Sequence, residues 1–277
     1  MNKLPIDVKI ILDEYIVLFH TSLPNTLEGF YLQGSIALDA YVKDSSDIDF
    51  IAIINRRLSG GEAEILAEIH REIASTYPKS EMDGVYLMWE DIGILDAAEM
   101  NYPYYNEGRL SYGAYFNAIT WWILKKHGIN IIGPQPTALN FEIGPQHLVE
   151  YVVENMKTYW AGRIEKIEQA MENMYQFTTE EIDVEIEWSV LGLLRQYYTL
   201  KEHAIISKLG AGEYAMMHMP AEWHPVIQEA IDIRKGLDGE RFVSDRERID
   251  EALKFSKFLI DYCDRHLSFN KIGHPNS

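Results

Sequence analysis

The sequence has one cysteine, Cys263, which excludes an intramolecular disulfide and any zinc site built from several cysteines. It also lacks an apolar run long enough to cross a bilayer, and its first residues show no signal-peptide cleavage pattern. Among the nine histidines, His218 and His224 have no third ligand at a spacing that zinc would need. A phosphate-binding loop of the Gly-x4-Gly-Lys-Ser/Thr type and a nucleophile elbow are missing too. We therefore expect a cytoplasmic protein without membrane association.

Basic residues are scarce, with 25 Lys and Arg against 43 Asp and Glu and a formal net charge of −18 at pH 7. Binding to nucleic acid requires a basic face, so this balance argues against DNA or RNA as a partner. An acidic cleft would instead attract a small cationic substrate. The alternative is that the acidity only keeps the protein soluble. The length of 277 residues is sufficient for two domains.

The pattern of apolar residues changes near residue 140. Before it, short strand-like runs alternate with helical patterns, and the Tyr- and Asn-rich segment 101–113 has the composition of a loop. After it, the patterns are helical only, and Gly210-Ala-Gly212 is interpreted as a turn that ends a helix. We predict an α/β domain over residues 1–140 and an all-α helical domain over residues 141–277. The expected strands are 30–33, 48–54 and 82–88, and the expected helices are 5–19, 63–77, 116–126, 148–174, 186–200 and 244–263.

The most informative motif is Gly34-Ser35, followed after eleven residues by Asp47-Ile48-Asp49 at an apolar run. Side chains alternate along a strand, so the two aspartates share one face. Two carboxylates can share divalent cations, and a Gly-Ser turn can hold a phosphate through backbone N–H groups and a hydroxyl. The pattern favours Mg²⁺-dependent nucleotidyl transfer. The alternative is a surface turn with exposed carboxylates.

This spacing resembles the signature of the nucleotidyltransferase superfamily with the DNA polymerase β-like fold. The resemblance implies an α+β fold, with a mixed sheet flanked by helices in the N-terminal domain and a helical bundle in the C-terminal domain. It also implies that Asp47 and Asp49 hold two Mg²⁺ ions and that Gly34 and Ser35 contact the phosphates of ATP.

A third carboxylate, Asp83, lies in a segment that is similar to a Leu-Glu-Val-Thr-Val segment of aminoglycoside adenylyltransferases of the spectinomycin and streptomycin type. The resemblance implies that Asp83 is a catalytic residue. It leaves open whether Asp83 is the general base, a metal ligand or a residue that acts through water. Glu81 lies on the same face of the strand as Asp83 and is the alternative candidate for this role. A second alternative is that these residues are only the acidic end of a strand at the protein surface.

Two C-terminal segments, 193–198 and 208–230, also resemble these adenylyltransferases. The resemblance implies that Arg195 and Lys208 contact the phosphates of ATP. It also aligns Glu185 near a carboxylate with which those enzymes contact the antibiotic. Trp188 is close to Glu185 in the sequence, and its indole ring would add cation–π attraction. The alternative for Arg195 and Lys208 is that they are surface cations on helices. The alternative for Glu185 is that it belongs to the charged face of a helix.

Together these features imply an enzyme that transfers AMP from MgATP to a hydroxyl of a small cationic acceptor and releases pyrophosphate. The resemblance favours an aminoglycoside or aminocyclitol antibiotic, bound between the two domains. Other acceptors remain open, among them a lincosamide, another metabolite or a protein hydroxyl. The alternative to an enzyme is a regulatory or antitoxin-like module that binds a nucleotide without turnover. Both a monomer and a homodimer are compatible with the sequence.

Overall fold

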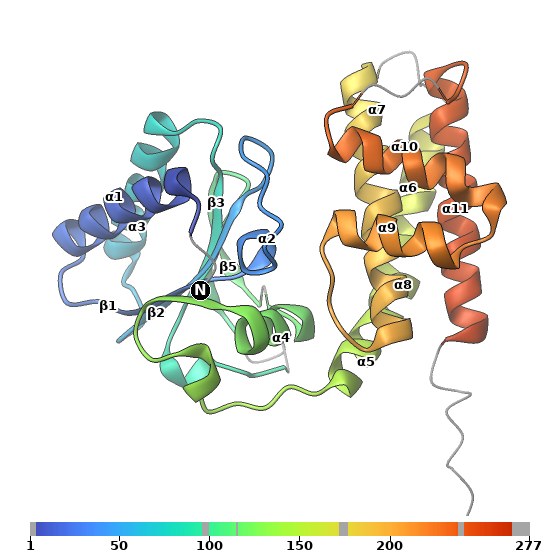
Figure 1. Ribbon diagram of the computed structural model, residues 1–277. Coiled ribbons are helices and arrows are strands. Elements are labelled where there is room, and N and C mark those ends of the chain that lie inside the picture. The colour runs from blue at the N-terminus through green and yellow to red at the C-terminus, as the bar shows by residue number, and fades with distance from the viewer. Residues whose placement is uncertain (1–3, 96–99, 115, 172–176, 238–240, 268–277) are drawn as a thin grey trace, which may run out of the picture. The chain divides into compact units, whose positions relative to one another are not determined.

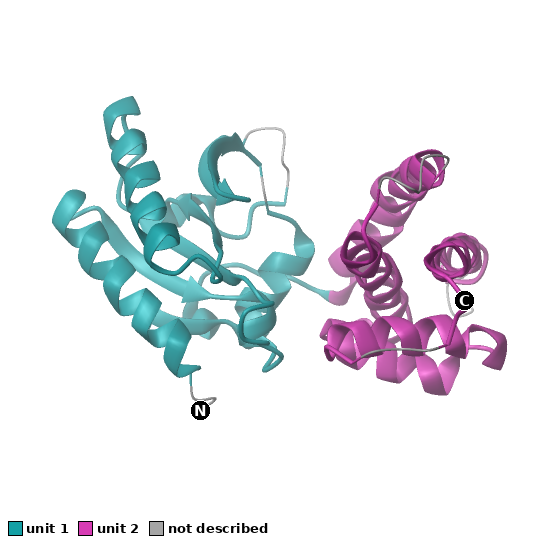
Figure 2. Cartoon of the chain, turned by 90° about the horizontal axis from the view of Figure 1, so that it is seen from above, with its two compact units in different colours: residues 1–144 teal, residues 145–277 magenta. Residues whose placement is uncertain are grey.

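The computed structural model describes residues 4–95, 100–114, 116–171, 177–237 and 241–267. Contacts divide the chain into two units, Met1–Gly144 and Pro145–Ser277, coloured teal and magenta in Figure 2. The first unit is built around a sheet, and the second consists of helices (Figure 1). No helix within the described ranges has the length and apolar character needed to span a membrane.

The N-terminal unit contains a six-stranded sheet with the strand order β5-β4-β3-β2-β1-β6. Strands β2 and β3 are parallel, and the other neighbours are antiparallel. This arrangement confirms the predicted α+β class with a mixed sheet. The central strand β2 consists mostly of isoleucine and other apolar residues, which suits a strand buried on both faces. The strands are β1 (Leu27–Leu32), β2 (Ile48–Ile54), β3 (Met82–Leu87), β4 (Tyr102–Asn106), β5 (Arg109–Gly113) and β6 (Ile129–Ile132).

Four α-helices cover the sheet, with α1 and α3 side by side on one face and α2 and α4 on the other (Figure 1). The core under α1 and α3 is aromatic: Phe30 and Phe50 stack at 5.0 Å between ring centroids, and both are fully buried. Every second residue of β1, β2 and β3 points into this core, so the alternate residues face α2 and α4. The helices are α1 (Ile6–Ser22), α2 (Gly34–Ala37), α3 (Gly60–Thr76) and α4 (Ala118–His127).

Residues 101–113 form the hairpin β4–β5, so the predicted loop is wrong. The two strands are joined by Glu107 and Gly108, which both have positive φ, at 49° and 72°. Such a two-residue turn matches the twist of the strands. Glycine is a common residue for this backbone and glutamate is not, which is why the turn was not recognised from sequence.

The C-terminal unit confirms the predicted all-helical character of this part of the chain. Two of its long helices each contain a π-helical turn, η4 (Met156–Trp160) and η6 (Glu187–Leu191), in which the hydrogen bonds skip one residue more than in an α-helix. The α-helices are α5 (Pro145–Asn155), α6 (Ala161–Ala170), α7 (Thr179–Ile186), α8 (Gly192–Glu202), α9 (Lys208–His218), α10 (His224–Arg234) and α11 (Asp245–His266).

Gly210 and Gly212 lie inside α9, so their interpretation as a helix-ending turn is wrong. The Ser207 hydroxyl accepts a hydrogen bond from the Gly210 N–H and caps the start of this helix. A Cβ atom at Gly212 would lie 2.7 Å from Ile231 Cγ1 and 3.0 Å from Leu191 Cδ2. The glycine is therefore used for close packing of α9 against α10 and η6.

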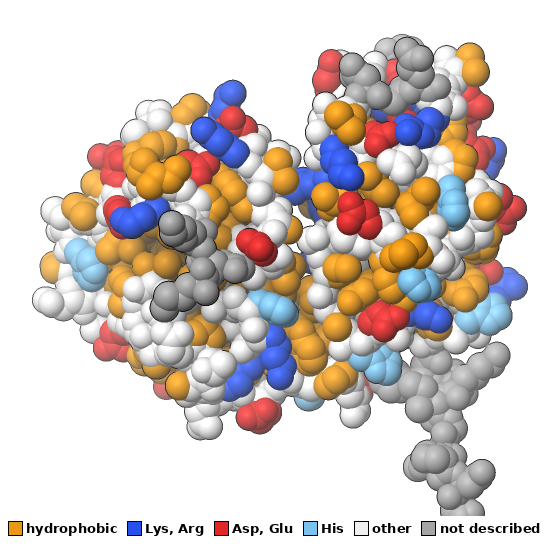
Figure 3. Space-filling view, viewed as in Figure 1, with side chains coloured by type: hydrophobic (Ala, Val, Ile, Leu, Met, Phe, Trp, Pro, Cys, Tyr) orange, Lys and Arg blue, Asp and Glu red, His pale blue; other side chains and the backbone are white. Residues whose placement is uncertain are grey.

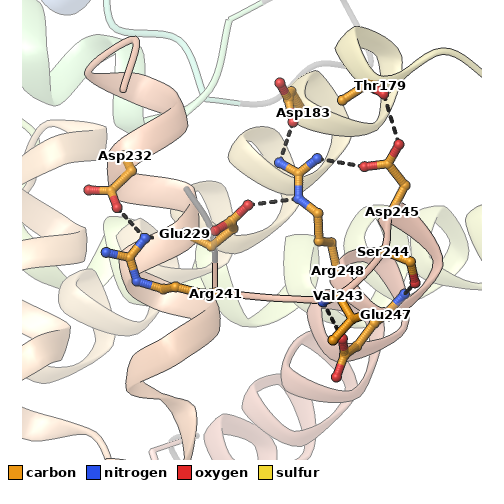
Figure 4. Close-up of polar contacts among 10 residues, drawn as sticks. All are labelled: Thr179, Asp183, Glu229, Asp232, Arg241, Val243, Ser244, Asp245, Glu247 and Arg248. Atoms are coloured by element: carbon orange, nitrogen blue, oxygen red, sulfur yellow. Dashed lines mark hydrogen bonds and ion pairs between the residues drawn. The ribbon is translucent and has the colours of Figure 1, made fainter. Parts of the chain in front are cut away.

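One arginine, Arg248 at the start of α11, joins three helices of this unit (Figure 4). Its guanidinium donates to Asp183 on α7, to Glu229 on α10 over 2.7 Å and to Asp245 over 2.8 Å. Only 1% of Glu229 is exposed, so its charge depends on these cations. Arg241 contributes a second cation at 3.8 Å from Glu229. The network fixes the first turn of α11 against its neighbours.

Candidate active site

The aspartates of the sequence motif meet at the beginning of the parallel strand pair. Asp49 is the second residue of β2, and its register partner on β3 is Asp83. Adjacent strands lie about 4.8 Å apart, and both side chains lie on the face opposite the aromatic core. Asp47 directly precedes β2, so alternation gives it the same face. The structure therefore brings together Asp49 and Asp83, with Asp47 two residues before Asp49.

The turn after β1 packs directly against Asp49. The Gln33 N–H donates to the Asp49 carbonyl over 3.0 Å, and the Gln33 side chain accepts from the Gly34 N–H over 3.1 Å. Gly34 has φ +61°, and a Cβ atom there would lie 1.9 Å from Asp49 Oδ2. Only glycine fits this position. The next residue, Ser35, has a buried hydroxyl with no hydrogen-bond partner within the described part of the chain.

These carboxylates interact electrostatically. Burial raises the pKa of Asp83 to about 8, and the charges of Glu81, Asp47 and Asp49 add to the effect. Burial is also the largest cause of a raised pKa at Glu81, with the Asp47 charge second. Four acidic groups are therefore concentrated at one end of the sheet, where a cation would relieve their repulsion.

The donor chemistry at this point fits Mg²⁺, because Mg²⁺ prefers oxygen ligands. Across the described residues, no group of three or more His, Cys, Asp or Glu side chains has a ready-made metal-binding arrangement. Mg²⁺ commonly binds through one or two carboxylates together with water and substrate phosphates rather than in an all-protein cage. The Asp49–Asp83 pair is consistent with that kind of site.

The predicted ATP contacts of the helical unit, Arg195 and Lys208, belong to one cationic cluster. Lys208 Nζ lies 3.1 Å from Glu187 Oε1, and Arg234 Nη1 lies 3.4 Å from the same oxygen. Burial lowers the pKa of Lys208, Glu187 opposes this effect, and the charges of Arg234 and Arg195 add to it. Lys208 and Arg234 thus share the Glu187 carboxylate, and Arg195 is close enough to Lys208 to act on its pKa, which gives the cluster an excess of positive charge.

Glu185 and Trp188, the predicted acceptor contacts, are both in contact with cations of the chain itself. Arg163 on α6 donates to both carboxylate oxygens of Glu185, over 3.2 and 2.5 Å. Its Cζ lies 5.3 Å from the Trp188 ring centroid, and Lys208 Nζ lies 5.2 Å from it. Burial raises the pKa of Glu185, and Arg163 opposes this effect.

Sequence reasoning missed Arg163 and Arg234. Both are partners of predicted site residues, but each comes from a different helix, more than 20 positions away along the chain. A helical pattern shows which face of a helix is apolar, not which residue of another helix lies opposite. The π-helical turn η6, which carries Glu187 and Trp188, was the other feature without a sequence signal.

The chain is similar to known proteins over most of its length. Residues 155–258 match the family model described as aminoglycoside adenylyltransferase, C-terminal domain. The aminoglycoside (3'') (9) adenylyltransferases of Escherichia coli and Klebsiella pneumoniae are each 26% identical to the chain, over 89% of its length and 92% of theirs.

Among solved structures, spectinomycin adenyltransferase AAD(9) from Enterococcus faecialis, crystallised with ATP and spectinomycin, matches with a TM-score of 0.66. The match covers 91% of this chain and 99% of that one, at 17% identity, and it shows the same fold. The helical unit thus contains the domain of the family model, and the relatives align with most of the chain. The chain is thus similar to aminoglycoside adenylyltransferases over most of its length, and residues 155–258 match the model of their C-terminal domain.

Proposed function

We propose that the protein is a nucleotidyltransferase that transfers AMP from ATP to a hydroxyl of a small cationic acceptor, an aminoglycoside or aminocyclitol antibiotic, and releases pyrophosphate. The observation that carries the proposal is the pairing of Asp49 with Asp83 on adjacent parallel strands, with Gly34 packed on Asp49. The relatives named as aminoglycoside adenylyltransferases support the choice of acceptor.

In this proposal the N-terminal unit, with the division expected near residue 140, is the catalytic domain. Asp47, Asp49 and Asp83 are its acidic residues, and the Ser35 hydroxyl and the backbone at Gly34 bind phosphate oxygens. A buried hydroxyl without a protein partner suits this role, because a ligand would restore its hydrogen bond. Asp83 is either the base that receives the acceptor proton or a metal ligand, and its raised pKa suits a group that takes up a proton near neutral pH.

Asp47 and Asp49, with Asp83 as a further candidate, would hold the two Mg²⁺ ions that the family resemblance implies. When bound there, Mg²⁺ would neutralise phosphate charge and increase the acidity of the acceptor hydroxyl. The three aspartates place their carboxylate oxygens at one end of the sheet. Gly34, which has no side chain, leaves room for the carboxylate of Asp49.

The helical unit would supply the positive charge that a triphosphate needs. Lys208 and Arg195 are the proposed phosphate contacts, and Arg234 adds a third cation to the same cluster. Glu187 holds Lys208 in place until the phosphates compete for it. Glu185 and Trp188 are the proposed acceptor contacts. We further propose a cytoplasmic monomer or homodimer with no nucleic-acid partner.

The test is mass spectrometry of acceptors incubated with purified protein and MgATP. The panel contains streptomycin, spectinomycin, kanamycin and lincomycin, and the matched control is Asp49→Asn. We expect an AMP adduct on an aminoglycoside or aminocyclitol and none with Asp49→Asn. Undiminished adduct formation by both Asp47→Asn and Asp49→Asn would reject the metal assignment. No adduct on any compound, although ATP binds, would reject the acceptor class.

A further inference from the structure

The carboxylate assigned to the acceptor is already occupied by a cation of the protein. Arg163 binds both oxygens of Glu185, and the two side chains are 32% and 20% exposed. A bidentate pair that is partly withdrawn from water is stronger than a surface ion pair. An amine that approaches Glu185 must therefore displace the guanidinium of Arg163 or bind beside it.

The aromatic contact is occupied in the same way. Arg163 and Lys208 both lie within cation–π distance of the Trp188 ring. Glu187, the next carboxylate along the chain, is paired with Lys208 and Arg234. On the face of the helical unit that Figure 3 shows, basic and acidic side chains are interspersed and form no continuous acidic surface. The charges of Glu185 and Glu187 are thus balanced by cations of the chain itself.

A cavity of about 480 Å³ lies next to this ion pair, with Arg163 and Glu185 among its lining residues. Most of its wall is apolar, and Tyr159 and Phe177 present aromatic rings that are 45% and 38% exposed. A cavity of this size accommodates a small molecule or a large part of one. Its wall suits an alkyl group or the apolar face of a sugar ring.

The charges on the cavity wall balance. Lys166 and Arg163 are the cations, and Glu181 and Glu185 are the carboxylates. Glu181 is already used, because its carboxylate accepts the Thr178 N–H over 2.8 Å in the capping box of α7. Lys166 forms no ion pair within the described residues. The wall thus offers no carboxylate that is free of an intramolecular partner.

We infer that Arg163 is a specificity-determining residue: by binding Glu185 it disfavours acceptors with many amines and favours an amino sugar or aminocyclitol with one or two amines and an apolar group that enters the cavity. The inference rests on the proposed function for the identity of the reaction, but it concerns acceptor binding alone. It assigns Arg163 a role in selection, not in the chemical step.

The test measures acceptor binding by isothermal titration calorimetry with the full chain. Kanamycin represents acceptors with several amines, and lincomycin represents those with one amine and an alkyl chain. Arg163→Gln should lower the Kd for kanamycin about tenfold or more, because a partly buried carboxylate is released for a charge-assisted hydrogen bond. The Kd for lincomycin should change less than about threefold.

Two controls separate selection from simple charge removal. Lys166→Gln removes a cation from the same helix and the same cavity wall without releasing a carboxylate, so it should leave the Kd for kanamycin nearly unchanged. Adding Glu185→Gln to Arg163→Gln should abolish the gain. Thermal melting of each variant checks that it is folded, and Arg163→Lys provides a milder change if Arg163→Gln is not.

The inference is overturned if Arg163→Gln does not tighten kanamycin binding, if Lys166→Gln tightens it equally, or if no variant binds either compound. AMP transfer is followed separately in the same samples by mass spectrometry. The expected binding pattern without any AMP transfer would reject the proposed reaction and leave the role of Arg163 in place. AMP transfer without the expected binding pattern would support the proposed reaction and reject the role of Arg163.

Discussion

In the candidate site, the relative placement of residues with a fixed spacing is the part that could be predicted from sequence. Gly34, Asp49 and Asp83 come together because they lie at the ends or starts of neighbouring strands, and strand alternation determines their shared face. Arg163 and Arg234 could not be found in this way, since each acts across helices. The sequence also did not indicate that Glu185 is ion-paired with Arg163 and that Glu187 is ion-paired with Lys208 and Arg234.

Gly34 gives the sharpest test at this scale. In Gly34→Ala the new Cβ would meet Asp49 Oδ2 at 1.9 Å, and alanine at φ +61° is strained by about 1 kcal/mol or more. We expect AMP transfer to fall about a hundredfold or more, because the Asp49 carboxylate must move. Initial rates measure this effect. Gly61→Ala is the matched control, since nothing lies within 4 Å of a Cβ there, and normal rates for Gly34→Ala would contradict the prediction.

His70 should make the stability of the protein dependent on pH. The ring is 2% exposed, Nε2 lies 2.6 Å from the Tyr86 hydroxyl, and Tyr105 stacks on it at 3.7 Å. Burial lowers the pKa of His70 to about 3. In the unfolded chain the pKa is about 6.5, so between these values the unfolded state binds more protons. The contribution of His70 to the free energy of unfolding is therefore fully present above pH 6.5, and it decreases as the pH falls toward 3.

At pH 5 the loss from His70 should be about 2 kcal/mol relative to pH 7. Urea unfolding at both pH values measures it, with His70→Gln as the reference in which this contribution is absent. The variant should be less stable at pH 7 and should lose less on acidification. The same loss in both proteins would show that His70 is not responsible.

Whole elements were predicted where the apolar pattern is long. The helices α1, α3 and α4 and the strands β2 and β3 were expected within a few residues of their bounds. The hairpin β4–β5 and the short strand β6 were missed, because tertiary packing and a turn with positive φ at a glutamate produce them. Packing of α9 against α10 explains why two glycines occur inside a helix.

Arg248 tests how the helices of the second unit are joined. Arg248→Met should destabilise the protein by about 3–5 kcal/mol, because the buried Glu229 would lose its closest cation (Figure 4). Arg265→Met on the same helix is the control, since its pair with Asp261 is exposed at 70% and 53%. That change should cost less than about 1 kcal/mol. Chemical denaturation compares the two, and equal losses would argue against the network.

At the scale of the whole molecule, the chain consists of two units that each bury their own core. Phe30 and Phe50 are fully buried in the first, and Leu193 and Phe255 are fully buried in the second. From sequence, the change in the apolar pattern near residue 140 predicts a division of the chain at that point. Each unit exceeds 100 residues, the usual size of an independent folding unit.

We therefore expect the fragment 145–277 to fold alone. It should show a helical circular dichroism spectrum and one cooperative melting transition, and it should catalyse no AMP transfer, since Asp47, Asp49 and Asp83 are outside it. A helical but non-cooperative fragment would contradict the prediction. The fragment 1–144 is the complementary sample.

The π-helical turn η6 has a consequence for the history of the site. A π turn accommodates one residue more than an α-helical turn, so a helix can gain or lose a single residue at 187–191 while both flanking segments keep their packing. Each residue of an α-helix is rotated by about 100° from the one before it. An insertion or deletion here would thus turn Trp188 to another side of the helix in one evolutionary step. Under the proposed function, in which Trp188 contacts the acceptor, acceptor recognition can diversify at this turn while the fold is preserved.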